Sequence, residues 1–149
     1  MPVVPPPAYA VAGALVQRAV APERRSGTFR KVAGAALALG SLGVIAAADV
    51  AFRRHHTTVN PFDPGRATSM VTSGPYGFTR NPMYVGMAGL LTAHAVGRGG
   101  WLTPLPVAAF VAVIDRTQIP AEERAMRANF GEEYDDYRAH VPRWLGRPG

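Results

Sequence analysis

Acids, tyrosines and an asparagine in two separate segments are the side chains best suited to bind a cationic ligand or move a proton. Glu122 and Glu123 are adjacent acids just after an apolar run, and Tyr76 and Tyr84 lie on either side of Arg80-Asn81-Pro82. Proline suits the first turn of a helix and asparagine the position before it, so this segment predicts a helix N-terminus capped by Asn81. The N–H groups of such a terminus favour a carboxylate or another acceptor.

Each of these signals also has an ordinary structural explanation. Asn-Pro at a helix start is more often capping than a binding site, adjacent glutamates are usually a solvated face, and an interfacial tyrosine is usually a membrane anchor. His94 lies inside an apolar run and is more simply a packed or hydrogen-bonded helix residue. His55 and His56 are too close together to chelate one ion and have no third ligand, and the chain has no cysteine, so no metal site is predicted.

Four apolar runs must position these groups. The clearest, residues 32–52, has one charge near its end and spans roughly 30 Å, the thickness of a bilayer core. A first membrane helix is expected to start near Ala8. The third and fourth runs, residues 83–96 and 101–114, are shorter and form a helical hairpin around the turn at 97–100. The alternative is the buried helices of a soluble protein, but a domain of 149 residues rarely holds several of them.

The second run also has a surface of small residues that permits close helix packing, and a dimer is one possible use of it. This surface consists of Gly34, Gly40, Ser41 and Gly43.

The polar segments must supply the chemistry. Residues 53–82 are too long for a plain connector, and long ordered loops are usually functional. Because a tight hairpin places its open ends on one side, this loop and the tail at 115–149 are expected to meet on one membrane face. Within the tail we expect a helix over 121–129, a break at Gly131 and a second helix over 132–140.

The chain is basic, with a net charge of +6, and its arginines flank the apolar runs. This pattern favours lipid headgroups over nucleic acid, which is not predicted as a partner. Ten of the 16 Lys and Arg residues lie in the loop and tail and five on the other side. The bias predicts a multi-pass protein of the cell (inner) membrane whose loop and tail face the cytoplasm. Four positive charges within residues 22–31, on the opposite side, argue against this orientation.

These segments occur together in an order that resembles a known family. Residues 71–76, the block Arg80-Asn81-Pro82-Met83-Tyr84-Val85-Gly86, the Glu122-Glu123 pair and residues 130–137 look like the isoprenylcysteine carboxyl methyltransferases. Similarity to phospholipid N-methyltransferases is more distant. The resemblance covers about half of the chain, residues 66–145. It implies an all-α integral membrane methyltransferase of the EC 2.1.1 class, with about four transmembrane helices in a single domain over residues 1–149.

The resemblance also implies a site. Two membrane helices lie in residues 1–52, and residues 53–149 hold the cofactor-binding loop, the helical hairpin and the tail. The implied cofactor is S-adenosylmethionine, with S-adenosylhomocysteine as product, and the acceptor is a lipophilic small molecule with a carboxylate, thiol or amine. Glu123, which orients or deprotonates the acceptor, and Arg116 are the implied catalytic residues. The implied cofactor-binding residues are Thr68, Ser69, Met70, Val71, Tyr76, Asn81, Pro82, Met83, Tyr84 and Glu122.

Two positions depart from the family pattern. Asn81 stands where the family usually has histidine, and Gln118 stands where eukaryotic members have an arginine, the nearest here being Arg116. The resemblance therefore does not assign a prenylcysteine carboxylate as the substrate. The alternative function is a non-catalytic membrane protein or complex subunit that keeps the methyltransferase fold.

Overall fold

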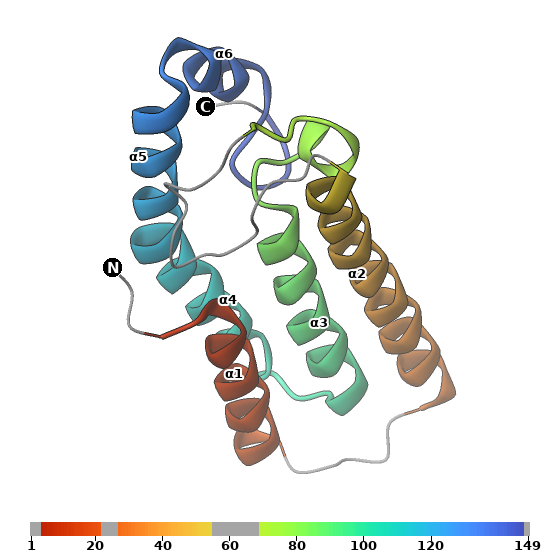
Figure 1. Cartoon of the computed structure of the whole chain (residues 1–149). Coiled ribbons are helices and arrows are strands. Elements are labelled where there is room, and N and C mark those ends of the chain that lie inside the picture. The colour runs from red at the N-terminus through yellow and green to blue at the C-terminus, as the bar shows by residue number, and fades with distance from the viewer. Residues whose placement is uncertain (1–3, 22–26, 55–68, 148–149) are drawn as a thin grey trace.

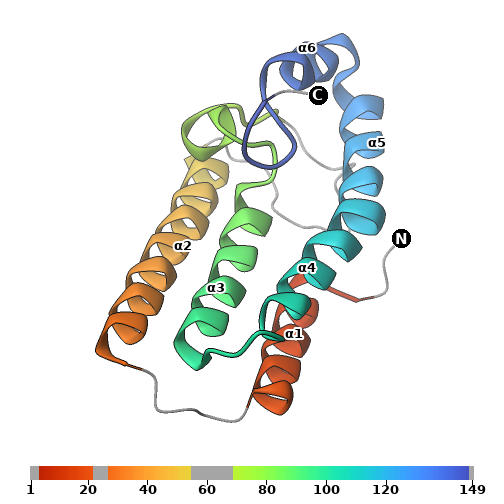
Figure 2. The same cartoon turned by 180° about the vertical axis from the view of Figure 1, so that it is seen from behind.

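The computed structural model describes residues 4–21, 27–54 and 69–147, and every regular element among them is helical. Helices α1 to α4 lie alongside one another as a bundle, and α5 and α6 extend beyond one end of it (Figures 1 and 2). Helix α3 contacts α1, α2 and α4. In chain order the elements are α1 (Pro6–Val20), α2 (Thr28–Arg54), the 3-10 turn η2 (Gly74–Gly77), α3 (Pro82–Arg98), α4 (Pro104–Val113), the π-helical turn η3 (Ile114–Gln118), α5 (Ile119–Phe130) and α6 (Glu132–His140).

The predicted helices form, with bounds shifted by local chemistry. Helix α1 begins at Pro6, ahead of Ala8, because proline is tolerated in the first turn, and Pro82 likewise opens α3. The break at Gly131 is confirmed, since this residue has φ +54° between α5 and α6. The tail helix, however, is not separate from the fourth run. Helix α4 continues through η3 into α5, so the tail begins as an extension of the bundle.

Helices α2 and α3 pack closely because small residues line their contact. A Cβ atom on Gly86 would overlap the Ile45 side chain and lie 3.0 Å from the Ser41 carbonyl oxygen, and one on Gly34 would lie 3.0 Å from the Ala93 carbonyl oxygen. Gly40 and Gly43 face open space instead. The predicted small-residue surface is therefore divided, with Gly34 and Ser41 turned to α3 and two glycines turned outward.

Helix α1 is fastened to the bundle by one buried glutamine. The Gln17 amide nitrogen donates to the carbonyl oxygens of Leu91 at 3.1 Å and Thr103 at 2.9 Å. Its amide oxygen lies 2.7 Å from His94 Nδ1. Because the Gln17 nitrogen is the donor in both carbonyl contacts, the oxygen accepts from the imidazole. The prediction that His94 is a hydrogen-bonded helix residue is confirmed.

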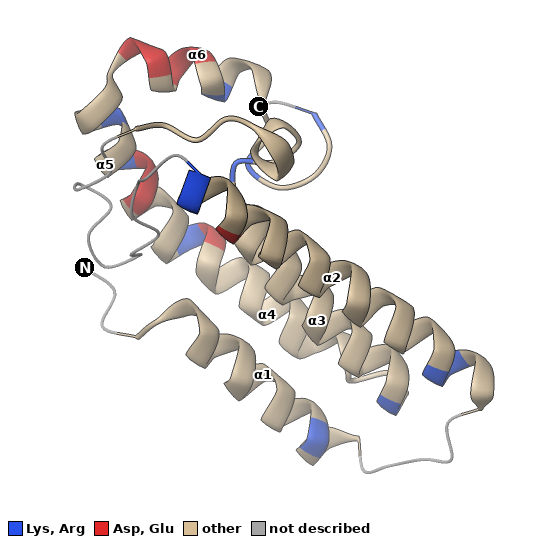
Figure 3. Cartoon of the chain, turned by 45° about the vertical axis from the view of Figure 1, so that its right-hand side comes forward, with Lys and Arg blue, Asp and Glu red and all other residues tan. Residues whose placement is uncertain are grey.

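The surface of the bundle suits a membrane. Among the described helices, α2 alone is long and apolar enough to cross a bilayer. Only 17% of its most apolar stretch is buried, whereas the core helix of a soluble protein is mostly buried. Charged residues lie near the two ends of the bundle and leave an uncharged band between them (Figure 3). Helices α1, α3 and α4 are shorter than a standard span, so four transmembrane spans remain a prediction.

Candidate functional site

The loop before α3 and the chain after α6 meet at one end of the bundle (Figure 2). The Arg80 N–H donates to the Pro142 carbonyl oxygen at 2.8 Å, and the Thr79 hydroxyl donates to the Arg143 carbonyl oxygen at 3.0 Å. The Tyr137 hydroxyl donates to the Tyr76 carbonyl oxygen at 2.7 Å. The prediction that loop and tail lie together is confirmed. We call residues 141–144, which carry the Pro142 and Arg143 contacts, the C-terminal segment.

Asn81 contributes to this junction in an unexpected way. It occupies the position before α3, but its side chain makes no capping hydrogen bond. Instead the amide nitrogen donates to the Arg143 carbonyl oxygen at 2.9 Å. The predicted cap is therefore wrong, because the amide points toward the C-terminal segment rather than back over the first turn of α3.

Glu122 is a partly buried acid held by two donors from different helices. The Tyr84 hydroxyl donates to Glu122 Oε1 at 2.5 Å and the Gln118 amide nitrogen donates to the same oxygen at 2.6 Å. Burial raises the pKa of Glu122, and the two hydrogen bonds oppose that rise. Among the described residues Glu122 forms no ion pair. Its carboxyl group is therefore oriented, and no cation in the described part of the chain neutralises it.

Glu123, by contrast, lies between two arginines. Arg143 contacts it in a bidentate manner, with Nε 3.1 Å from Oε1 and Nη2 2.6 Å from Oε2. Arg80 Nη2 lies 3.3 Å from Oε1, and the Glu123 side chain is only 14% exposed. Arg143 also reaches Asp115 Oδ1 at 3.2 Å, the oxygen to which the Trp144 indole N–H donates at 2.9 Å. The hydrogen bond to Glu123 raises the pKa of Arg143.

Arg80 is the most unusual cation of the site. Its side chain is 6% exposed, and its Nη2 atom contacts Glu123. Its Nε and Nη1 atoms have no hydrogen-bond partner among the described residues. A buried guanidinium normally satisfies its five N–H donors, because leaving them unpaired costs free energy. The spare donors of Arg80 thus suit an anionic ligand.

An apolar wall lies beside these charges, at the end of α2. Val71 and Tyr76 form a buried cluster with Ala48 and Ala51, and Met83 packs against it. The Tyr76 ring also packs edge-on against Phe52, with ring centroids 5.2 Å apart.

The structure brings most of the predicted site together but not all of it. Ser69 and Met70 are partly buried at the start of the described loop, Pro82 is buried, and Thr68 lies outside the described residues. Arg116 is exposed and makes no side-chain hydrogen bond or ion pair with any residue that the structure describes. It therefore lies apart from the contacts around Glu123.

Sequence reasoning assigned no role to Arg143, Asp115 or Trp144. The available signal was Pro142-Arg143-Trp144 directly after α6, a proline that ends the helix and is followed by a cation and an indole donor. Arg80 was visible inside the motif, but its burial was not.

An all-helical bundle with one long exposed apolar helix and a cluster of acids and arginines at one end is the architecture of a membrane protein with a polar site. The sequence profile described as phospholipid methyltransferase matches residues 29–133, which run from α2 into α6. The chain belongs to the phospholipid methyltransferase family. The match supports the more distant of the two resemblances and does not single out the isoprenylcysteine carboxyl methyltransferases.

Two curated proteins are similar to parts of the chain. An uncharacterized protein of Haemophilus influenzae is 38% identical over 63 residues, which cover 42% of this chain and 100% of that protein. The nickel-cobalt-cadmium resistance protein NccN of Alcaligenes xylosoxydans xylosoxydans is 32% identical over 87 residues, 55% of this chain. The match covers 38% of NccN, so this chain corresponds to less than half of that protein. No solved structure matches.

Proposed function

We propose that this protein is an S-adenosylmethionine-dependent membrane methyltransferase that acts on a lipophilic or membrane-associated acceptor. One observation carries the proposal. Glu122, an oriented acid that pairs with no cation among the described residues, and Arg80, a buried arginine whose Nε and Nη1 have no partner among them, belong to the same end of the bundle. Family membership supplies the methyl-transfer chemistry, and this pair of groups supports the cofactor.

The charges of the two residues fit that cofactor. S-adenosylmethionine carries an ammonium, a sulfonium and a carboxylate. Glu122 would hold a positive group through a charge-assisted contact, and the spare Arg80 donors would hold the carboxylate. Tyr84 and Gln118 keep Glu122 in place through its Oε1 atom. The apolar wall of Val71, Tyr76 and Met83 would pack against the less polar part of the cofactor.

When bound, the cofactor supplies an electrophilic methyl group on its sulfonium. The protein then has to align the acceptor and keep water out, because an in-line displacement depends mainly on positioning and desolvation. The C-terminal segment packs against the loop that precedes α3 and supports the site from that side.

Glu123 and Arg116 remain the predicted catalytic residues, and the contacts favour a more specific role for Glu123. A carboxylate that already accepts hydrogen bonds from Arg143 and lies against Arg80 is better suited to orient a neighbour than to remove a proton. We therefore propose that Glu123 orients the acceptor and does not deprotonate it. Glu123 also holds Arg80 in place.

The proposed setting is a bilayer crossed by α1 to α4, with the site on the cytoplasmic face. Short spans are accommodated by local thinning of the bilayer and by flanking arginines that reach the headgroups. The carboxylate, thiol or amine that receives the methyl group belongs to a lipophilic small molecule, and no nucleic-acid partner is proposed.

Thermal stability of the full chain in detergent tests the proposal. We expect S-adenosylmethionine and S-adenosylhomocysteine each to raise the melting temperature, and Glu122→Gln to remove most of that rise. If neither compound stabilises the protein, the alternative of a non-catalytic membrane protein or complex subunit is favoured. The partial likeness to NccN, a protein named for metal resistance, would then guide the search. A labelled-methyl assay on a lipid extract would identify the acceptor.

A further inference from the structure

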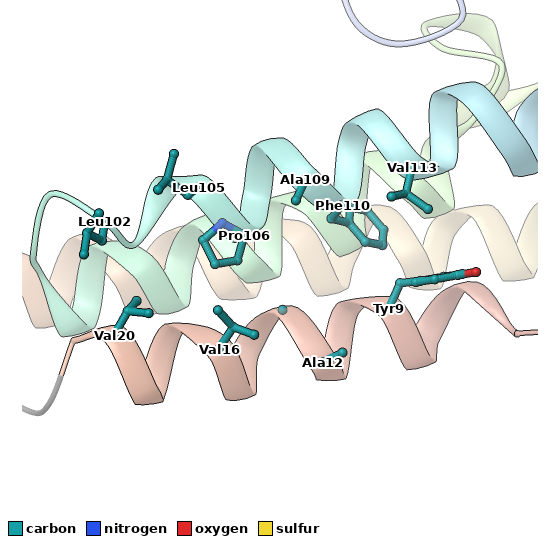
Figure 4. A pocket seen from close by; sticks show the side chains of 11 residues that line it. Tyr9, Ala12, Val16, Val20, Leu102, Leu105, Pro106, Ala109, Phe110 and Val113 are labelled. Carbon is teal, nitrogen blue, oxygen red and sulfur yellow. The ribbon is translucent and has the colours of Figure 1, made fainter.

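The groove between α1 and α4 offers a ligand no charged side chain. Eleven residues line it, and the Tyr9 hydroxyl is the one polar side-chain group among them (Figure 4). The candidate site is different, because there one carboxylate, that of Glu123, contacts two guanidinium groups, those of Arg80 and Arg143. How this carboxylate is shared between the two arginines determines which donors each arginine has left for an anionic ligand.

The two arginines hold Glu123 unequally. Arg143 contacts both carboxylate oxygens, with Nη2 2.6 Å from Oε2 and Nε 3.1 Å from Oε1. Arg80 contacts only Oε1, through its Nη2 atom at 3.3 Å, and its buried Nε and Nη1 atoms have no hydrogen-bond partner among the described residues. A two-point pair between a guanidinium and a carboxylate is stronger and more directional than a one-point contact. Glu123 is therefore bound mainly by Arg143.

The backbone of the C-terminal segment fixes Arg143 in this position. The Arg143 carbonyl oxygen accepts hydrogen bonds from two side chains just ahead of α3, those of Thr79 at 3.0 Å and Asn81 at 2.9 Å. The Arg80 N–H donates to the carbonyl oxygen of Pro142 at 2.8 Å. The two arginines are thus joined through the main chain, and their side chains meet at the acid that they share.

Release of Glu123 from Arg143 would change the state of Arg80. The two oxygens of a carboxylate match two nitrogens of a guanidinium, so a released Glu123 can turn and pair with Arg80 at two points. That pairing would occupy donors of Arg80 which the proposed function gives to the carboxylate of the cofactor. Arg143 can therefore influence ligand binding at Arg80 without touching the ligand.

We propose that Arg143 is a positioning residue that keeps Glu123 from pairing with Arg80 at two points, so that Arg80 retains donors for the carboxylate of the ligand. The inference rests on the proposed function, in which the ligand is S-adenosylmethionine. An arginine with a purely structural role would also weaken the site when it is replaced. Neutralising Glu123 would not repair that kind of damage, and this difference separates the two roles.

Calorimetric titration of the full chain in detergent with S-adenosylhomocysteine tests the role of Arg143. Arg143→Gln should lower the affinity about tenfold, the equivalent of one charge-assisted contact. The double variant Arg143→Gln/Glu123→Gln should recover most of that loss, because the amide no longer competes for Arg80. Arg127→Gln is the matched control, since it removes another arginine from an ion pair, with Asp135 at 3.0 Å, and should leave the affinity unchanged. A loss that persists in the double variant would overturn the proposal.

The conservative variant Arg143→Lys gives the same comparison if Arg143→Gln does not fold. An ammonium group cannot form the two-point pair, so Arg143→Lys should also lower the affinity, and Glu123→Gln should again restore it. Equal affinity in Arg143→Lys and the unaltered chain would contradict the need for a two-point pair.

Nitrogen NMR of the arginine side chains follows Arg80 without any cofactor, with its signals assigned by their loss in Arg80→Lys. The side-chain N–H protons of Arg80 should move to lower field in Arg143→Gln as they gain a carboxylate acceptor, and return in the double variant with Glu123→Gln. Unchanged signals would overturn the proposal. If the unaltered chain binds neither S-adenosylmethionine nor S-adenosylhomocysteine, the proposed function fails, and these signals still decide whether Arg143 controls the pairing of Arg80.

Discussion

The side-chain amide of Asn81 donates a hydrogen bond to the backbone carbonyl of Arg143 over 2.9 Å, which joins the start of α3 to the C-terminal segment. Asn81→Ala removes this bond and leaves the carbonyl to Thr79 alone, so we expect a loss of about 1 kcal/mol in unfolding free energy. Asn81→Asp should cost more, because a carboxylate would face the carbonyl oxygen. Asn81→His should restore stability if a ring N–H reaches the carbonyl. Melting temperatures in detergent measure all three, and equal values for Ala and Asp would contradict the assigned contact.

Glu122→Gln should weaken S-adenosylmethionine binding by about ten- to hundredfold. This range corresponds to the loss of one charge-assisted hydrogen bond of roughly 1.5–3 kcal/mol. Gln keeps the shape of the side chain and an acceptor for Tyr84, so the loss should come from the missing charge. Calorimetric titration measures the affinity. Glu133→Gln is the control, since Glu133 is exposed on α6, and its affinity should match that of the unaltered chain.

The raised pKa of Glu122 gives a pH dependence with a definite sign. The folded protein holds the proton more tightly than the unfolded chain, whose ordinary value is 4.5. The contribution of Glu122 to stability is therefore complete below pH 4.5 and falls as pH rises through the raised folded-state pKa. Without cofactor, the melting temperature of Glu122→Gln minus that of the unaltered chain should increase between pH 4.5 and 8. Cofactor affinity should rise over the same window as Glu122 ionises. A flat difference would count against a buried acid at this position.

Gly86→Ala should separate α2 from α3, because the new methyl group would meet the Ile45 side chain and the Ser41 carbonyl. Overpacking of this kind typically costs about 1–3 kcal/mol. Gly43→Ala is the matched control on the neighbouring helix, since nothing lies within 4 Å of its Cβ position. Alanine also favours a helix over glycine by up to about 1 kcal/mol, so the control should be neutral or stabilising. Melting curves that rank the two variants in the opposite order would refute the α2–α3 packing.

The sequence could predict the helices because apolar period, proline and glycine act locally. Pro82 and Gly131 mark helix ends through their own backbone preferences, and the structure follows them. The residues around Asp115 do not by themselves predict that α4 continues into α5. A π-helical turn depends on how the helical segments on either side of it pack against the rest of the protein. The sequence motif likewise indicated the candidate site residues, but it did not show which of them contact one another.

Which cation neutralises which acid depends on the tail's path through space. Arg143 follows Glu123 by 20 residues and meets it only because α6 turns the chain back. Arg116, the catalytic arginine that the family resemblance implied, is nearer to Glu123 in sequence but is exposed, and the described arginines that contact Glu123 are Arg80 and Arg143.

The π-helical turn Ile114–Gln118 separates two helical stretches that face different demands. Each backbone hydrogen bond in such a turn encloses one residue more than in an α-helix, so the two stretches are offset by about 100° around their common axis. The apolar stretch α4 can keep its packing against α1 and α3 while α5 turns Glu122 toward Tyr84. One surplus residue thus sets the rotation between the apolar stretch of the helix and the stretch that carries Glu122 and Glu123. Removing a single residue from 114–118 would rotate the acids off the site without changing any of them.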